Sequence, residues 1–305
     1  MTYSPPTAHQ IADAQNTDSN LRLLLAQRKL YSIAKVWSGI RGFGVGVVAI
    51  AAPILTAIWE EAALPMAAIA ASWFVLNRLL FKNIEQRYVE RAASAQEQFD
   101  TAIFGMPTIT IREPRLVPEE VRRLTGGRTR RGKLYSDESL KNWYPVRKDM
   151  DGGTAIAISQ RANLMYAQTL LRKNANLWAV LLIAWILIAF AIGIASKFDL
   201  LTFLLVVALP TLPPFLDAVD EWLRVRRAGK QRRTIANEIQ DAISTDTPVP
   251  PDHLLTWQFH LFTLRRDSPL VPDWLYWMLR SRTEDEMTEG AKVIAKKTGS
   301  RKDED

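Results

Sequence analysis

The stretch Asn174–Ser196, with the sequence NANLWAVLLIAWILIAFAIGIAS, decides the fold class of this chain. It runs for 23 residues without a charge and consists mostly of Leu, Ile, Ala and Trp. A helix needs roughly 20 apolar residues to cross a hydrocarbon core about 30 Å thick. The stretch therefore predicts a transmembrane helix rather than the buried core helix of a soluble protein.

Three further blocks have the same apolar character. Gly42–Trp59 has no charged residue, and Ala62–Phe81 has only Arg78, which lies close enough to its end to snorkel. Leu200–Leu216 is uncharged but short, and its three prolines predict a kinked or broken helix. We therefore expect four membrane spans, with a buried core helix as the alternative for the short fourth block.

The positions of Lys and Arg predict the topology of these spans. The turn between the first two blocks has only Glu60 and Glu61 as charges, and the turn between the last two has only Lys197 and Asp199. Basic residues gather instead before the first block, between the second and third, and after the fourth. Since Lys and Arg stay on the cytoplasmic side, we expect both termini and residues 83–173 in the cytoplasm.

The sequence next to the spans predicts helices that extend them into the cytoplasm. From Ile84 to Ile103, apolar or small residues recur at steps of three or four, which forms one helical stripe. Four acids on this helix, together with Arg87 and Arg91, are interpreted as a solvated charged face. These acids are Glu85, Glu90, Glu97 and Asp100. Further helices are expected over residues 17–33, 154–173, 231–243 and from Pro272 onward.

The predicted fold class is an all-α membrane protein. It has four transmembrane helices in two hairpins, helical cytoplasmic extensions and a small irregular basic cytoplasmic segment. In chain order we expect a cytoplasmic N-terminal helix, the first hairpin, a cytoplasmic helical and basic region, the second hairpin and cytoplasmic C-terminal helices. The expected bounds are 1–35, 36–81, 82–173, 174–219 and 220–305.

The segment Met106–Ser139 differs from the rest of the chain, because it is rich in Gly, Pro and Arg and has weak periodicity. One short strand is expected in it, over Thr108–Ile111. Within this segment, Arg112–Lys133 has eight basic and three acidic residues, which gives a local net charge of +5. Such a segment attracts anions. It either contacts anionic lipid head groups or binds a phosphate or nucleotide through its arginines.

Enzyme chemistry has little support in the sequence. The chain has no Cys, which excludes disulfides, thiol catalysis and Cys-based metal sites, and it has only three His. A Walker A motif, a GxGxxG motif and a nucleophile elbow are absent. The GxGxG run Gly42–Gly46 lies in an apolar block and is interpreted as a helix-packing site. We interpret His253 and His260, which flank Trp257, as structural, and we expect no enzyme activity, no metal and no cofactor.

The end of the fourth block contains the residues that we expect to gate conduction. Its prolines free backbone carbonyls at membrane depth, which suits a gate or pore lining but also a plain bend. Three acids follow, and they either line an ion path or pair with Arg224 and Arg227. The candidate gate residues are Pro210, Pro213, Pro214, Asp217, Asp220 and Glu221. The first hairpin, with its GxGxG run, is the alternative lining of the pore.

Five short motifs along the chain resemble one known family. They are Asn20–Tyr31 (NLRLLLAQRKLY), Ala92–Asp100 (AASAQEQFD), Asn142–Pro145 (NWYP), Ser159–Asn163 (SQRAN) and Val271–Tyr276 (VPDWLY). Together with the two predicted membrane hairpins, they make the chain similar to the SMODS-associated four-transmembrane effector family over nearly its whole length.

The resemblance implies a role in bacterial anti-phage defence (CBASS). Such effectors accompany a nucleotidyltransferase that makes a cyclic oligonucleotide after infection, and their expected output is permeabilisation of the inner membrane. The expected partners are the lipid bilayer, further copies of the chain in a homo-oligomer and the cyclic oligonucleotide messenger, with no DNA or RNA. Four helices leave little lumen, so a pore requires several subunits. The alternatives are a housekeeping ion channel or transporter, and a membrane scaffold that docks a cytoplasmic partner.

Guanidinium groups bind phosphates and aromatic rings stack on bases, so both are expected in a messenger site. The basic segment supplies the arginines, and two aromatic residues follow it in sequence. Arg161 is added because it lies in the SQRAN motif and shortly before a membrane helix. The candidate ligand-binding residues are Arg122, Arg123, Arg128, Arg130, Arg131, Trp143, Tyr144 and Arg161.

Overall fold

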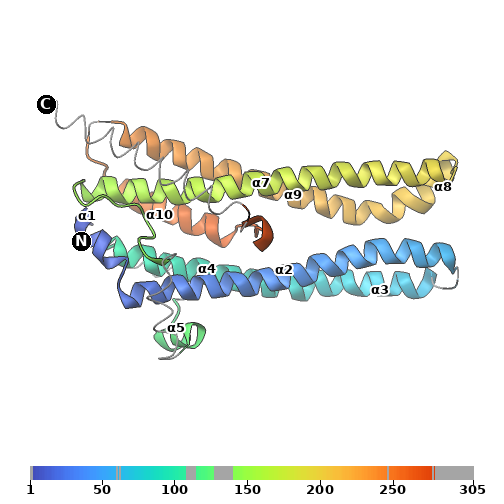
Figure 1. Ribbon diagram of the computed structural model, residues 1–305, viewed down its shortest axis with the longest axis horizontal. Helices are drawn as coiled ribbons and strands as arrows, with labels where there is room; N and C mark the ends of the chain where they lie inside the picture. The colour runs from blue at the N-terminus through green and yellow to red at the C-terminus, as the bar shows by residue number, and fades with distance from the viewer. Residues whose placement is uncertain are drawn as a thin grey trace.

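Two long helical hairpins make up most of the structure, which is a computed structural model. They are antiparallel, lie side by side and have their turns at the same end of the molecule (Figure 1). Every regular element in the described part of the chain is a helix, in agreement with the predicted all-α class. The described residues are 3–59, 61, 63–107, 115–126, 140–245, 247–276 and 278.

The first hairpin pairs α2 (Asp18–Ile58) with a return helix of similar length. The return helix runs without a break from α3 (Ala63–Leu76) through the π-helical turn η2 (Asn77–Phe81) into α4 (Lys82–Ile103). The apolar stretch and the predicted extension therefore form one continuous rod, and α4 packs along α2.

The second hairpin begins with α7 (Gly152–Ala195), the longest helix of the structure. Asp151 caps it, because its Oδ2 accepts a hydrogen bond of 3.0 Å from the backbone amide three residues later. The chain returns through α8 (Leu200–Phe203), the π-helical turn η5 (Leu204–Ala208) and α9 (Leu209–Ile243), which packs along α7.

The proline run Pro210–Pro214 lies inside α9, and the helix continues through it. Of the predicted kink or break, the break does not occur, and the helix bends near the turn of the hairpin (Figure 1). Thr211 Oγ1 donates to the carbonyl oxygens of Val207 (2.7 Å) and Ala208 (3.3 Å), where η5 joins α9. Such hydrogen bonds from a hydroxyl to the preceding turn bend a helix without ending it.

The half of the hairpins that contains the turns exposes large apolar side chains. In the described part of the chain, two helices are long and apolar enough to cross a membrane, namely Leu64–Ile103 and Gly152–Ala195. On α7, Val180, Leu187 and Ile194 are 63%, 63% and 78% exposed. Exposure of so many apolar side chains to water is unfavourable, whereas a hydrocarbon layer accommodates them. These surfaces are those of a membrane protein.

A glycine that packs against an aromatic ring fixes the register of each hairpin. A Cβ atom on Gly44 of α2 would lie 1.8 Å from the ring of Trp73, and one on Gly193 of α7 would lie 2.7 Å from the ring of Phe203. Only glycine permits these close approaches. The interpretation of the GxGxG run as a packing site is confirmed at Gly44, while Gly42 has open space around its Cα.

The opposite half of the molecule has a conventional buried core to which two shorter helices contribute. These are α1 (Ala8–Ala14) and α10 (Pro251–Arg266), which pack against α4 and α7. Trp257, Phe99 and Ile156 are among the fully buried side chains of this core. The core therefore joins the two hairpins at the end away from their turns.

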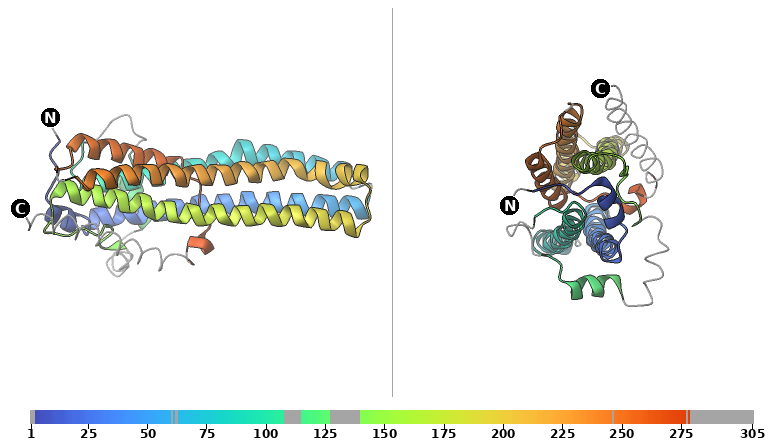
Figure 2. Two further views of the ribbon diagram at one scale, coloured as in Figure 1. Left: turned by 90° about the horizontal axis from the view of Figure 1, so that it is seen from above. Right: turned by 90° about the vertical axis from the view of Figure 1, so that its left-hand side faces the viewer.

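A third short helix, α5 (Pro118–Thr125), lies in the segment that was expected to be irregular. It packs on the outer side of the first hairpin, away from α7 and α9 (Figure 2). Pro118 begins the helix and Gly126 follows its end, which is the usual placement of both residues. The strand expected over Thr108–Ile111 lies outside the described residues. The helix expected from Pro272 begins there, since the backbone amide of Tyr276 donates to the Pro272 carbonyl (3.0 Å).

Candidate functional site

A buried carboxylate lies at the centre of the core that joins the hairpins. Asp100 of α4 has no exposed surface. Its Oδ2 forms a salt bridge of 2.6 Å with Arg265 Nη1 of α10 and accepts a hydrogen bond of 3.1 Å from Gln258. Its Oδ1 accepts a hydrogen bond of 2.7 Å from the hydroxyl of Tyr144. The interpretation of this acid as part of a solvated face is therefore wrong.

The polar network extends from Asp100 to both hairpins. Gln258 Nε2 also donates to Glu97 Oε2 of α4 (2.7 Å), which is 6% exposed rather than solvated. Gln160 Nε2 of α7 donates to Gln258 Oε1 (3.1 Å) and to the Leu254 carbonyl (3.0 Å). One set of hydrogen bonds thus connects α4, α7 and α10, and α4 and α7 are the helices that continue into the apolar half.

Burial and charge together shift the pKa values of this network. Burial raises the pKa of Tyr144 well above its ordinary value, and the negative charge of Asp100 adds to the effect. Burial lowers the pKa of Arg265, but the attraction of Asp100 outweighs it, so the net direction is upward. Both shifts keep Arg265 charged and Tyr144 protonated, which is the state that the hydrogen bonds to Asp100 require.

A second buried arginine lies on α9. Arg232 is 3% exposed and donates to the carbonyls of Ala228 (3.0 Å) and Leu264 (2.6 Å) and to the hydroxyl of Ser268 (3.0 Å). It has no carboxylate partner within the described ranges. Burial therefore lowers the pKa of Arg232 to about 10. The core that joins the hairpins thus holds a second buried guanidinium besides that of Arg265.

Two ion pairs lie where the apolar half of the hairpins begins. Arg41 Nε of α2 is 3.0 Å from Glu85 Oε2 of α4, and Arg224 of α9 binds Glu221 through two nitrogens (2.9 and 2.8 Å). Burial raises the pKa of Glu85, and both members of the α9 pair act on it electrostatically. Each pair lies within one hairpin, and the two pairs are near enough to interact electrostatically.

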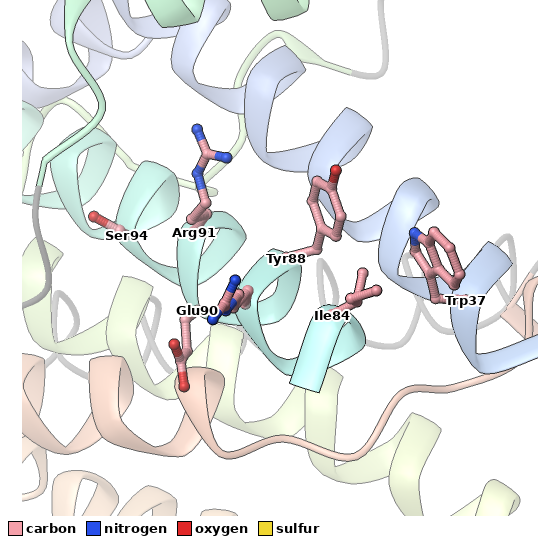
Figure 3. Close-up of a pocket in the computed structure, with 7 residues that line it drawn as sticks. Trp37, Ile84, Tyr88, Glu90, Arg91 and Ser94 are labelled. Atoms are coloured by element: carbon pink, nitrogen blue, oxygen red, sulfur yellow. The ribbon is translucent and has the colours of Figure 1, made fainter. Parts of the chain in front are cut away.

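A hollow of about 500 Å³ lies on the first hairpin. Its walls include Trp37 of α2 and Ile84, Arg87, Tyr88 and Arg91 of α4. Figure 3 shows Tyr88 and Arg91 pointing to the same side of α4, with the Trp37 ring of α2 on the other side of Tyr88 from Arg91. Two guanidinium groups, two aromatic rings and the carboxylate of Glu90 thus line one open space.

The predicted ligand residues that the structure describes do not lie together. Arg122 and Arg123 are exposed on α5, whereas Arg128, Arg130 and Arg131 lie outside the described residues. The ring of Tyr144 is 3% exposed and lies against Phe99 and Phe104, with centroids 6.2 and 5.6 Å away. A ligand on α5 therefore does not reach this ring.

The other two predicted ligand residues are partly buried. Trp143 packs against the same core as Tyr144. Arg161 lies on α7, and burial lowers its pKa. Its Nε is buried and has no hydrogen-bond partner among the described residues. Neither residue lines the hollow on the first hairpin.

The predicted gate residues follow one another along α9. Glu221 pairs with Arg224, as one of the two interpretations expects. Asp217 and Asp220 are exposed on α9, and within the described ranges neither forms an ion pair. The two exposed acids face away from the buried core, next to the apolar half of the hairpin.

Sequence reasoning missed the polar network and the hollow. The signals were present in the motif Ala92–Asp100, where two acids stand among small residues that a solvated face does not require. The hollow uses Arg87 and Arg91, which were assigned to the solvated face with those acids. In the described part of the chain, no group of three His, Cys, Asp or Glu side chains is placed to hold a metal ion.

Comparison with known proteins finds similarity along almost the full length of the chain. Residues 9–294 match the family described as the SMODS-associating 4TM effector domain. A protein of Bacillus cereus strain VD146, described as a probable CBASS effector molecule, is 22% identical over 296 residues, or 90% of this chain and 95% of the relative. No solved structure matches the chain significantly.

Proposed function

The chain belongs to the SMODS-associating 4TM effector family, and from this premise we propose that it is the membrane effector of a CBASS anti-phage system. In this proposal it binds a cyclic oligonucleotide and then permeabilises the bacterial inner membrane. The observation that carries the proposal is the division of both hairpins into an exposed apolar half and a half with a buried polar core. The name of the Bacillus cereus relative supports the CBASS assignment.

The four spans of one subunit are proposed to pack into a pore only with those of other subunits. In each hairpin the two helices pack directly against each other, as the contacts of Gly44 and Gly193 require. Such packing leaves no water-filled space within a hairpin. The homo-oligomer therefore supplies the lumen, lined either by α9 near Asp217 or by the first hairpin.

The continuous helices supply a route from ligand to membrane. A ligand on α4 acts on the same rod that contains α3, and the polar network connects this rod to α7. A ligand that binds the open state more tightly than the closed state shifts the population toward the open state. The size of the shift is set by the difference between its affinities for the two states. No enzymatic step is part of this mechanism.

The proposed topology predicts which positions react with an impermeant maleimide. The chain has no cysteine, so single cysteines report without interference. Glu61→Cys and Lys197→Cys, in the two hairpin turns, are expected to react in intact spheroplasts. Arg123→Cys on α5 and Lys230→Cys on α9 are expected to react only after lysis, because basic segments stay in the cytoplasm. The reverse pattern would contradict the topology.

Dye release from liposomes tests the function itself. Purified protein in liposomes filled with a self-quenching dye is expected to release it only when one of a panel of cyclic oligonucleotides is added. Release without any nucleotide would indicate a constitutive channel instead. Binding of a nucleotide without release would indicate a scaffold, since docking requires no leak.

A further inference from the structure

The hollow on the first hairpin combines the chemistry of a nucleotide site with an internal acidic group that competes for it. We propose that the messenger of the proposed function binds in this hollow, and that Glu120 of α5 holds Arg91 until a phosphate replaces it. The ligand class is a cyclic oligonucleotide, which has phosphates for the two guanidiniums and flat bases for the two rings. This inference rests on the proposed function and assigns its site.

The two arginines of the hollow differ in their partners. Arg91 forms an ion pair with Glu120 in the first turn of α5. Arg87 is exposed and has no ion pair with the described residues. A phosphate could therefore bind Arg87 directly, whereas it would have to displace Glu120 to bind Arg91. A guanidinium binds carboxylate and phosphate in the same bidentate geometry. Arg91 therefore keeps its hydrogen bonds when a phosphate replaces Glu120.

The surface of the first hairpin that holds α5 overlaps the wall of the hollow. Tyr88 lines the hollow and also packs against the apolar cluster that holds α5 on the first hairpin, which includes Leu116 and Val121. A base that stacks on Tyr88 and a phosphate that binds Arg91 would both weaken contacts of α5. The helix and the ligand therefore compete, and α5 acts as an internal inhibitor.

Aromatic contacts connect the hollow to the apolar half. The Trp37 ring in the wall stacks on Phe81, with centroids 5.9 Å apart, and Phe81 contacts Trp73 at 5.4 Å. Trp73 is the ring that packs against Gly44 and sets the register of the hairpin. Phe81 also ends the π-helical turn η2. A ligand that moves Trp37 thus acts on side chains of the predicted membrane span.

The binding experiment uses the full chain in detergent and three probes: cyclic di-AMP, cyclic GMP–AMP and cyclic tri-AMP. The double variant Arg87→Gln with Arg91→Gln is expected to bind the preferred nucleotide about tenfold more weakly or worse, because two charge-assisted contacts are lost. Glu120→Gln is expected to bind it about tenfold more tightly, because the competing carboxylate is gone. Glu119→Gln is the matched control, with the same charge change on the same helix turn and unchanged affinity.

The outcomes separate the site from the function and from a lipid site. Equal affinity of wild type and the double arginine variant overturns the site, while dye release by wild type still supports the function. If no probe binds but phosphatidylglycerol liposomes bind wild type more than the arginine variant, the hollow is a lipid head-group site and the nucleotide assignment is wrong. If Glu120→Gln and Glu119→Gln raise the nucleotide affinity equally, the proposed role of α5 is wrong.

Discussion

Asp100→Ala is expected to lower the free energy of unfolding by about 4 kcal/mol, because it leaves the buried charge of Arg265 without its partner. Tyr144 and Gln258 lose an acceptor in the same step. At about 2–4 °C per kcal/mol, the melting temperature of the detergent-solubilised protein should fall by on the order of 10 °C. Thermal unfolding followed by circular dichroism measures this change.

Two further variants show whether the loss comes from an unpaired buried charge. Asp267→Ala removes an exposed acid that pairs with Arg266 and is expected to cost less than about 1 kcal/mol. Asp100→Leu combined with Arg265→Met replaces the whole pair by apolar side chains and is expected to recover most of the stability. If the double variant is no more stable than Asp100→Ala, the buried charge is not the cause.

Replacement of Pro210, Pro213 and Pro214 by Ala is expected to abolish dye release while nucleotide binding and membrane insertion persist. Alanine favours a straight helix over proline by about 3 kcal/mol at each interior position. Two interior prolines, Pro213 and Pro214, thus contribute about 6 kcal/mol, which exceeds the roughly 5.5 kcal/mol that reverses a 1:99 equilibrium. Comparison of nucleotide-triggered release by the variant and wild type in the same liposomes tests this gate.

The control for the proline variant removes a proline that does not interrupt a helix. Pro251 occupies the first position of α10, where no intrahelical hydrogen bond is missing. Its replacement by Ala should leave dye release unchanged. Normal release by the triple variant of α9 would assign the gate to the first hairpin instead.

The sequence was sufficient to predict the helices whose signals are local. Asn174–Ser196 and the other apolar blocks lie in long helices because their composition permits little else in a membrane. The stripe from Ile84 to Ile103 predicted α4, which the structure packs on α2. The Pro118 and Gly126 pair also marked α5, but the high charge of the segment hid it.

The candidate site depended on contacts that no local pattern contains. Asp100 and Arg265 lie 165 positions apart, so their pairing follows only from the packing of α10 against α4. A charged residue among alanines is compatible with both a solvated face and a buried network. Tyr144 was near the basic segment in sequence, yet its ring belongs to the core between Phe99 and Phe104. Closeness in sequence therefore did not imply closeness in space for Tyr144 and the basic segment.

The close contacts of Gly44 and Gly193 set the register of each hairpin, and α7, which has no proline, can tilt as a stiff rod. With 44 residues at about 1.5 Å each, α7 is about 66 Å long. A tilt of about 5° near the polar network would displace the far tip of such a rod by about 6 Å, roughly one helical turn. Length thus amplifies small movements: in the proposed pore, a rearrangement the size of one side chain at one end of α7 would become a change of pore diameter at the other.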